Sequence, residues 1–183
     1  MLAPTNLKVH VVISCSICML LLVIYNSMLT ASAAQSNNNT NTNPILKAIQ
    51  EAPSTDSKYL KAKVTVKGFE LNADIPITSE LKSKGLAVKN QLKENEAMLF
   101  VFEDSAKHPF WMKDIKFPID IIWLDSDGKV VHIEQNLEPC LSVFICPNYS
   151  PNTDSQYVLE TVAGFTQRHN VSVGTDIGFE LVR

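Results

Sequence analysis

The sequence predicts a mainly β domain, built as a sandwich or barrel of antiparallel sheets with one or two short helices. Three observations lead to this fold class. Short apolar or alternating runs recur through residues 61–183, turn-forming residues separate most of them, and few segments are suited to a helix. Many short strands with little helix are typical of β-sandwiches and barrels.

The first elements lie between Lys61 and Gly85. Apolar residues alternate loosely from Lys61 to Ile75 and are interrupted by Lys67-Gly68, so we expect two strands joined by a turn. Thr78 can cap a short helix that Gly85 ends. A polar loop then leads to the next strand.

The middle of the chain carries the densest apolar pattern. Met98–Phe102 is nearly continuous and predicts a strand buried on both faces. Phe110–Met112 and Ile119–Leu124 read as two further strands. The turn Asp125–Gly128 then joins the second of these to a strand over Lys129–Glu134, which predicts a hairpin.

The last part of the domain begins with a long surface excursion. Residues 137–154 contain three prolines and little periodicity. Tyr157–Glu160 predicts a strand, Ala163–His169 a short helix, and Ile177–Val182 the final strand.

Residues 1–33 are predicted to be an export segment. Val9–Tyr25 is almost unbroken in its apolar character, and Ala31-Ser32-Ala33 has the small-x-small pattern of a cleavage site. A cleaved signal peptide is favoured over a retained membrane anchor, and both place the domain outside the cytoplasmic membrane. Residues 34–60 are expected to be a flexible linker rich in Asn, Thr and Ser, and residues 61–183 to be the β domain.

An exported location gives meaning to two further patterns. Cys140 and Cys146 are the two cysteines of the domain, and such a pair most often forms a disulfide outside the cytoplasm. A thiol metal site is the alternative, but the spacing matches no common zinc motif. Asn38, Asn148 and Asn170 each begin a glycosylation acceptor triplet.

Charge and motifs restrict the function classes. The net charge is −3 and no basic stripe follows the domain, which argues against a nucleic-acid partner. No phosphate-binding loop, Gly-x-Ser-x-Gly step or His-Glu-x-x-His motif occurs. We therefore expect no metal and no cofactor, and the sequence leans away from an enzyme.

Several short motifs, in order, resemble the family known as domain of unknown function 192 (DUF192). The resemblance covers residues 62–183. It is carried by Gly85-Leu86, Ala97-Met98-Leu99-Phe100, Phe110-Trp111-Met112-Lys113, Pro118-Ile119-Asp120-Ile121, Val158-Leu159-Glu160 and Ala163-Gly164. It implies a mainly β, sandwich-like fold and supplies no activity. Ala97 stands where the family usually has Gly, Lys89 where it has Arg, and Asp114-Ile115 where it has Asn-Thr.

Two acidic residues within apolar runs are candidate site residues. Asp120 and Glu160 need a partner or a proton if they are buried. The structural interpretation, which we favour, is that Asp120 accepts backbone hydrogen bonds or pairs with Lys113 or Lys89. If Asp120 and Glu160 meet across neighbouring strands, they form a candidate acid/base pair.

Aromatic and sulfur-containing residues suggest two other sites. Trp111, with Phe110 and Trp123, could present an aromatic platform to a sugar ring, although core packing is the commoner role. His108 and Met112 have side chains that suit copper, although Met is more often a core filler.

The sequence favours a secreted or surface-tethered, non-enzymatic module that binds a small molecule or a glycan. The candidate ligand-binding residues are Trp111, Asp120, Glu160, Lys113 and Lys89. The membrane is a partner if the N-terminal segment is retained. One alternative is a carboxylate-based hydrolase or lyase that uses Asp120 and Glu160. The other is a copper- or thiol-dependent module.

Overall fold

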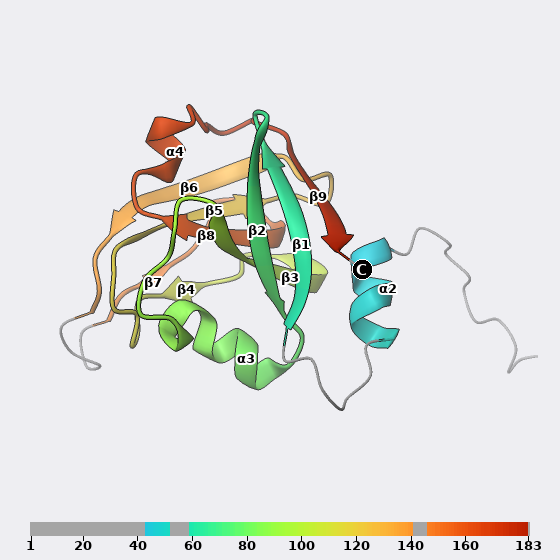
Figure 1. Cartoon of the computed structure of the whole chain (residues 1–183), viewed down its shortest axis with the longest axis horizontal. Helices are drawn as coiled ribbons and strands as arrows, with labels where there is room; N and C mark the ends of the chain where they lie inside the picture. Colours follow the sequence, from blue (N-terminus) through green and yellow to red (C-terminus); the bar gives the residue numbers. More distant parts are fainter. Residues whose placement is uncertain (1–42, 52–58, 141–145, 183) are drawn as a thin grey trace, which may run out of the picture. The chain divides into compact units, whose positions relative to one another are not determined.

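A computed structural model describes residues 43–51, 59–140 and 146–182. Seven strands form one curled sheet in the order β6-β5-β8-β3-β2-β1-β9, and β4 and β7 form a separate two-stranded sheet (Figure 1). The strands are β1 (Tyr59–Val66), β2 (Phe69–Pro76), β3 (Glu96–Ala106), β4 (Phe110–Trp111), β5 (Ile119–Leu124), β6 (Val130–Leu137), β7 (Asn148–Tyr149), β8 (Ser155–Val162) and β9 (Ile177–Val182). The helices are α2 (Pro44–Glu51), α3 (Ser79–Lys84) and α4 (Phe165–Arg168), and η1 (Gly85–Val88) is a 3-10 turn.

The prediction of a mainly β domain is confirmed, with one difference in strand direction. Neighbouring strands of the large sheet are antiparallel except for β2 and β3, which run parallel. Parallel neighbours need a crossover rather than a tight turn. Here α3 and η1 supply that crossover, and Thr78 caps α3 through a hydrogen bond from the Leu81 backbone N–H (3.2 Å).

The curl of the sheet brings its two edge strands together at one end. In Figure 1, β1 and β2 run roughly vertically, whereas β5, β6 and β8 run roughly horizontally, so the sheet turns strongly between its two ends. Lys129, just before β6, forms an isolated bridge with Asp176, just before β9. The Ile177 N–H also donates to the Gly128 carbonyl (2.9 Å). The sheet is thus joined at this corner without becoming a closed barrel.

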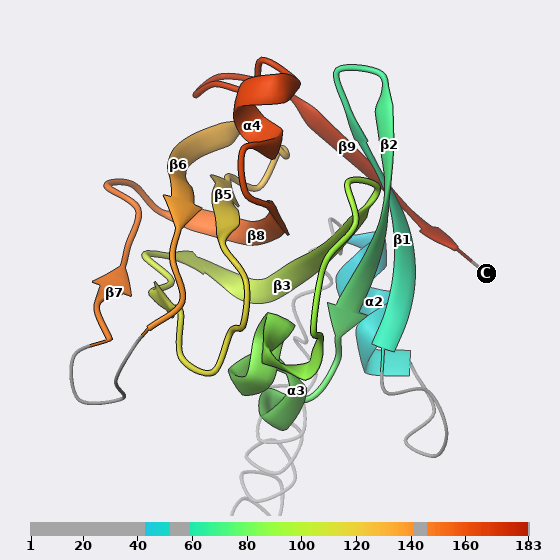
Figure 2. The ribbon, with the colours of Figure 1, turned by 60° about the vertical axis from the view of Figure 1, so that its left-hand side comes forward.

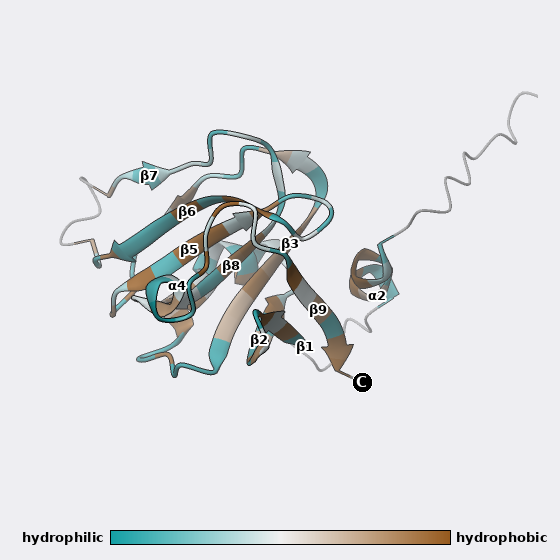
Figure 3. Ribbon diagram, turned by 90° about the horizontal axis from the view of Figure 1, so that it is seen from above, coloured by the Kyte–Doolittle hydropathy of each residue, from teal (hydrophilic) through white to brown (hydrophobic). Residues whose placement is uncertain are grey.

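Two hydrophobic clusters lie on the two faces of the large sheet. Alternation along β3 sends Leu99 to one face and Met98 and Phe100 to the other, all of them buried. The face that carries Leu99 is called the inner face. Its cluster contains residues from β1, β2, β5, β8 and β9, so it connects both ends of the sheet. The outer face is covered by η1 and the segment around β4 (Figure 2). Figure 3 shows brown, apolar residues along β5, whereas β7 is mostly hydrophilic.

The prediction of a flexible linker over residues 34–60 is wrong for residues 44–51 and 59–60, which the structure describes as regular elements. Residues 44–51 form α2, and β1 already begins at Tyr59. Asn43 starts the helix by accepting a hydrogen bond from the Ile45 N–H (3.0 Å), and Ile45 is buried in the inner cluster. An amphipathic segment that buries an apolar side chain against the sheet offsets the ordering entropy that a purely polar tract cannot. The predicted export segment, residues 1–33, and Asn38 lie outside the described residues.

The segment between β6 and β8 is held by a disulfide and by the pairing of β7 with β4. Cys140 and Cys146 form the predicted disulfide, with their Cα atoms 5.4 Å apart. Asn148 and Tyr149 then pair with β4, so the strand predicted at Phe110–Met112 belongs to the small sheet rather than the large one. The segment therefore holds β4 in place beside the outer face.

Gly68, in the turn between β1 and β2, allows backbone strain to be tested separately from steric clashes. Gly68 has a φ of +86°, and a Cβ placed there would meet no atom within 4 Å. Replacing Gly68 by alanine should lower the free energy of unfolding by about 1–2 kcal/mol, because an L-residue is strained in the left-handed region. Gly178 in β9 is the matched control, since it has equally open surroundings and an ordinary φ. Urea unfolding should find Gly178→Ala neutral or slightly stabilising. Equal losses for both variants would contradict this account.

Candidate functional site

A cavity of about 270 Å³ opens on the outer face of the sheet. Its walls come from the end of α3, from β3, from the segment through β4, and from one residue of β8. The residues that line it are Lys82, Ser83, Lys84, Gly85, Phe100, Phe102, His108, Pro109, Phe110, Trp111, Lys113, Ile115 and Glu160. Three of the predicted ligand-binding residues, Trp111, Lys113 and Glu160, therefore line one cavity.

Glu160 is the buried polar residue of this cavity. In β8 it lies opposite Met98 of β3 and Ile121 of β5, so its side chain shares the outer face with two apolar neighbours. It is only 2% exposed. Burial raises the pKa of Glu160 to about 8, against a smaller opposing effect of a hydrogen bond from the Leu86 backbone. At neutral pH the carboxyl group is therefore mostly protonated.

One oxygen of this carboxyl group has no partner. Among the described residues, Oε2 of Glu160 makes no hydrogen bond. Gly85, at the end of α3, has a φ of +47°, and a Cβ there would lie 3.6 Å from Oε2 and 3.4 Å from the Phe100 ring. The positive φ favours glycine at this position, and an added Cβ would make ordinary van der Waals contact with the carboxyl group and the ring. The protonated carboxyl group of Glu160 is therefore a buried hydrogen-bond donor at the wall of the cavity, and its Oε2 has no partner among the described residues.

Aromatic rings form much of the remaining wall. Phe102 and His108 stack with ring centroids 3.6 Å apart and planes 9° apart. Phe110 packs edge-on against Phe100 at 4.8 Å. Trp111 is 42% exposed, unlike Trp123, which is fully buried and donates through Nε1 to the His108 carbonyl (2.9 Å). Trp111 is therefore the one tryptophan of the proposed platform that presents a ring to solvent.

Two lysines border these rings. The Lys113 ammonium lies 5.2 Å from the Trp111 ring centroid, and the Lys82 ammonium lies at the same distance from the Phe102 ring. Lys82 also donates to the Val101 carbonyl (2.7 Å). Burial lowers the pKa of Lys82, while the charge of Glu103 acts in the opposite direction. Lysine ammonium groups over aromatic faces are stabilised by the ring quadrupole.

Asp120 lies on the opposite face of the sheet from Glu160. The register places Asp120 beside Thr161, and successive residues of a strand point to opposite faces. The acid/base pair of Asp120 and Glu160 is therefore not formed. The hydrolase or lyase hypothesis was built on this pair, and it loses the geometry that it requires.

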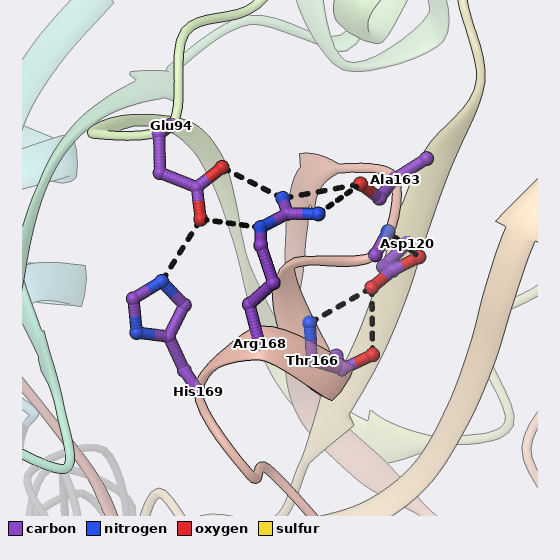
Figure 4. Close-up of polar contacts among 7 residues, drawn as sticks. Glu94, Asp120, Ala163, Thr166, Arg168 and His169 are labelled. Carbon is purple, nitrogen blue, oxygen red and sulfur yellow. Dashed lines mark hydrogen bonds and ion pairs between the residues drawn. The ribbon is translucent and has the colours of Figure 1, made fainter.

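The favoured structural interpretation of Asp120 agrees with its hydrogen bonds. Figure 4 shows its fully buried carboxylate beside Thr166, which donates from its backbone N–H (2.9 Å) and its hydroxyl (2.6 Å). The other oxygen accepts from the N–H groups of Asn136 (2.9 Å) and Gly164 (3.0 Å). Four donors satisfy the group, and neither Lys113 nor Lys89 is among them. Asp120 thus joins β5 to the end of β6 and to the start of α4.

A second polar cluster, which the sequence did not reveal, adjoins Asp120. In Figure 4, Arg168 of α4 reaches Glu94 with both ends of its guanidinium, at 3.0 and 2.7 Å. His169 contacts the same carboxylate at 2.9 Å, and Arg168 also donates to the Ala163 carbonyl. The hydrogen bond from Arg168 is the main cause that lowers the pKa of Glu94. No local signal announces this cluster, because its members are far apart in sequence.

Lys89 does not reach the cavity. Its ammonium lies 3.0 Å from Asp74 of β2, which also pairs with Lys61. Burial alone would raise the pKa of Asp74, but hydrogen bonds from Lys61 and Lys89 hold it below its usual value. The structure therefore places Lys89 in an ion pair at the β1–β2 side of the sheet and does not bring it together with Trp111, Lys113 and Glu160.

The structure does not gather the ligands of the copper or thiol hypothesis. Cys140 and Cys146 are joined in the disulfide, Met112 is fully buried in the outer cluster, and His108 is stacked on Phe102. β4 spans only Phe110–Trp111, so His108 and Met112 do not share a strand that would place them on one face. Within the described ranges, no three His, Cys, Asp or Glu residues form a potential metal site.

The two described glycosylation acceptors remain predictions. Asn148 and Asn170 are both exposed, Asn148 in β7 and Asn170 after α4. None of the helices in the described part of the chain has the length and apolar character of a membrane span.

Comparison with known proteins identifies a family and a fold. Residues 62–179 match the family DUF192, described as Uncharacterized ACR. A crystal structure of a candidate transcription regulator from Sinorhizobium meliloti 1021 is similar, with a TM-score of 0.59, 24% identity, and coverage of 68% of this chain and 97% of that one. A protein of unknown function from Novosphingobium aromaticivorans DSM 12444 gives a TM-score of 0.59, 24% identity, and coverage of 72% and 96%. The search of curated proteins found no match. At this identity, the two structures show the fold alone.

The raised pKa of Glu160 predicts how stability depends on pH. Between about pH 4.5 and 8, the folded chain retains a proton that the unfolded chain has released, so stability should fall as the pH rises through this window. The loss is at most about 1.4 kcal/mol per pH unit. Glu160→Gln should remove this dependence and be more stable than the parent near pH 8. Urea unfolding at several pH values measures the difference, and parallel curves for both proteins would refute the prediction.

Removing the Asp120 carboxylate should destabilise the domain strongly. Asp120→Ala leaves buried donors of Thr166, Gly164 and Asn136 without an acceptor, and the expected loss is about 3–5 kcal/mol. Asp176→Ala is the control, because its ion pair with Lys129 is exposed to solvent and contributes little to stability. Chemical unfolding of both variants tests this, and a similar small loss for each would show that the Asp120 network is dispensable.

Proposed function

We propose that this chain, which belongs to the DUF192 family, is a non-enzymatic binding module that holds a small glycan ligand in the cavity above Glu160. The observation that carries the proposal is the unpartnered Oε2 of Glu160, buried at the wall of that cavity. A buried polar atom without a partner costs free energy in the unbound protein. A ligand that supplies the missing hydrogen bond recovers that cost, so the carboxyl group favours an occupied cavity.

The aromatic wall supports a sugar ring as the ligand. Trp111 and Phe110 offer flat apolar surfaces, and Trp111 is accessible from solvent. Tryptophan suits such sites because a large apolar face is combined with a polar rim. Lys113, beside the Trp111 ring, can donate hydrogen bonds to hydroxyl groups at the edge of the sugar. The volume of about 270 Å³ suits one ring rather than an extended chain.

Binding without catalysis fits this chemistry better than hydrolysis. The described lining of the cavity contains a single carboxyl group, that of Glu160. Glycoside hydrolysis in most families requires two carboxyl groups that flank the same bond. Asp120 cannot serve as the second, because it lies across the sheet and its oxygens are already occupied.

We further propose that the module works outside the cytoplasmic membrane, either secreted or anchored. The apolar N-terminal segment of the sequence supports this location. The Cys140–Cys146 disulfide is consistent with an oxidising compartment. A glycan of the cell surface is then a ligand within reach.

A glycan array tests the proposal directly. The parent protein should bind a subset of immobilised glycans, and Trp111→Ala should lose at least about tenfold in affinity, because a stacked aromatic ring is removed. Val173→Ala is the control, since Val173 is 65% exposed and does not line the cavity. Absence of glycan binding by the parent would refute the proposal, as would equal binding by Trp111→Ala.

A further inference from the structure

We infer that the ligand of this cavity carries a carboxylate, so that the glycan recognised is an acidic sugar of the uronate type. This inference rests on the proposed binding function and narrows its ligand class. It depends on the charges around the cavity and on the position of the unpartnered Glu160 oxygen.

The charged groups that border the cavity are mostly cationic. Lys82, Lys84 and Lys113 line it together with His108. Lys84 is paired with Glu80 at 2.6 Å. Lys82 and Lys113 form no ion pair within the described part of the chain, and each ammonium lies over an aromatic ring instead. Two cations near a partly apolar cavity favour an anionic group in the space between them.

Glu160 reinforces this preference instead of opposing it. A carboxylate of the protein would repel an anionic ligand, but burial keeps Glu160 protonated at neutral pH. The protonated group can donate a hydrogen bond, and a ligand carboxylate is the strongest common acceptor for it. Gly85 keeps further atoms away from the buried Oε2, because a Cβ at this position would lie 3.6 Å from that oxygen.

Neutral and cationic ligands fit the same surroundings less well. A neutral sugar would stack on Trp111 and leave the Lys113 ammonium group without an ion pair among the described residues. A cation would meet Lys82 and Lys113 and find a single carboxyl group, which would first have to release its proton. An acidic sugar uses the ring, the ammonium groups and the Glu160 proton donor together.

The test measures binding of glucuronate, glucose and acetate to the full chain in detergent by isothermal titration. Glucuronate should bind at least about tenfold more tightly than glucose, which is the worth of one hydrogen bond between charged groups. Acetate carries the carboxylate without the ring and should bind more weakly than glucuronate. Trp111→Ala should weaken glucuronate binding.

Two variants assign the effect to individual residues. Lys113→Gln should weaken glucuronate binding by about tenfold and glucose binding by clearly less, because the glutamine amide can still donate a hydrogen bond to a sugar hydroxyl but carries no charge. Lys63→Gln is the matched control, because Lys63 lies in β1, pairs with Glu70 and does not line the cavity. Unchanged glucuronate binding by Lys113→Gln, or an equal loss in Lys63→Gln, would overturn the inference.

The pH dependence tests the role of Glu160. Between about pH 7 and pH 9, the parent should lose about tenfold in glucuronate affinity, because an ionised Glu160 repels the ligand. Lys82, Lys84, His108 and Lys113 also face the cavity, and Glu160→Gln retains all of them. Binding by Glu160→Gln should therefore change little over this range. An equal loss in parent and variant, or none in the parent, would overturn the assignment of Glu160.

The possible results separate the inference from the proposed function. Equal, Trp111-dependent binding of glucose and glucuronate would leave a glycan-binding module and overturn the acidic ligand. If acetate bound as tightly as glucuronate, the claim that the cavity recognises a sugar ring would be overturned. Failure of glucuronate and glucose to bind, together with an empty glycan array, would refute the proposed function itself.

Discussion

The hydrogen bonds of the Asp120 carboxylate hold together parts of the chain that no single element connects. They fix the end of β6 and the start of α4 against β5. Once α4 is fixed, Arg168 and His169 point toward Glu94, and this ion pair holds the loop that leads into β3. β3 is the central strand of the large sheet and contributes to both hydrophobic clusters. One buried charge is tolerated because four donors compensate its desolvation.

Asp120 and Glu160 show how the number of donors decides the role of a buried acid. They occupy neighbouring strands at adjacent register positions, and both are almost completely buried. Asp120 accepts four hydrogen bonds and is a structural group. Glu160 has one backbone donor and an oxygen without a partner, so burial dominates and its pKa rises. The difference in surroundings follows from register and from the alternation of faces along the strands. Asp120 of β5 lies opposite Thr161, the residue after Glu160 in β8, so its carboxyl group is directed to the face of α4 and that of Glu160 to the cavity.

Local patterns in the sequence were sufficient for most of the fold and for part of the site. The turn at Lys67-Gly68, the capped helix α3 and the buried run of β3 each depend on neighbours in sequence. Trp111, Lys113 and Glu160 could be proposed individually, since their residue types are unusual in their surroundings. Their meeting in one cavity could not, because it depends on strand register and on the path of the crossover. The pairing of Lys89 with Asp74 and of Arg168 with Glu94 was hidden for the same reason.

The one departure from an antiparallel sheet also accounts for the cavity. Because β2 and β3 are parallel, the chain must cross from one end of the sheet to the other between them, and α3 and η1 make that crossing on the outer face (Figure 2). The crossing places Gly85 and Leu86 directly beside Glu160 and brings Lys82 to the Phe102 ring. If a tight hairpin joined β2 and β3, the cavity would lack the residues of α3 and η1. The connection that the topology requires therefore supplies both the backbone donor to Glu160 and one of the cations that favour an anionic ligand.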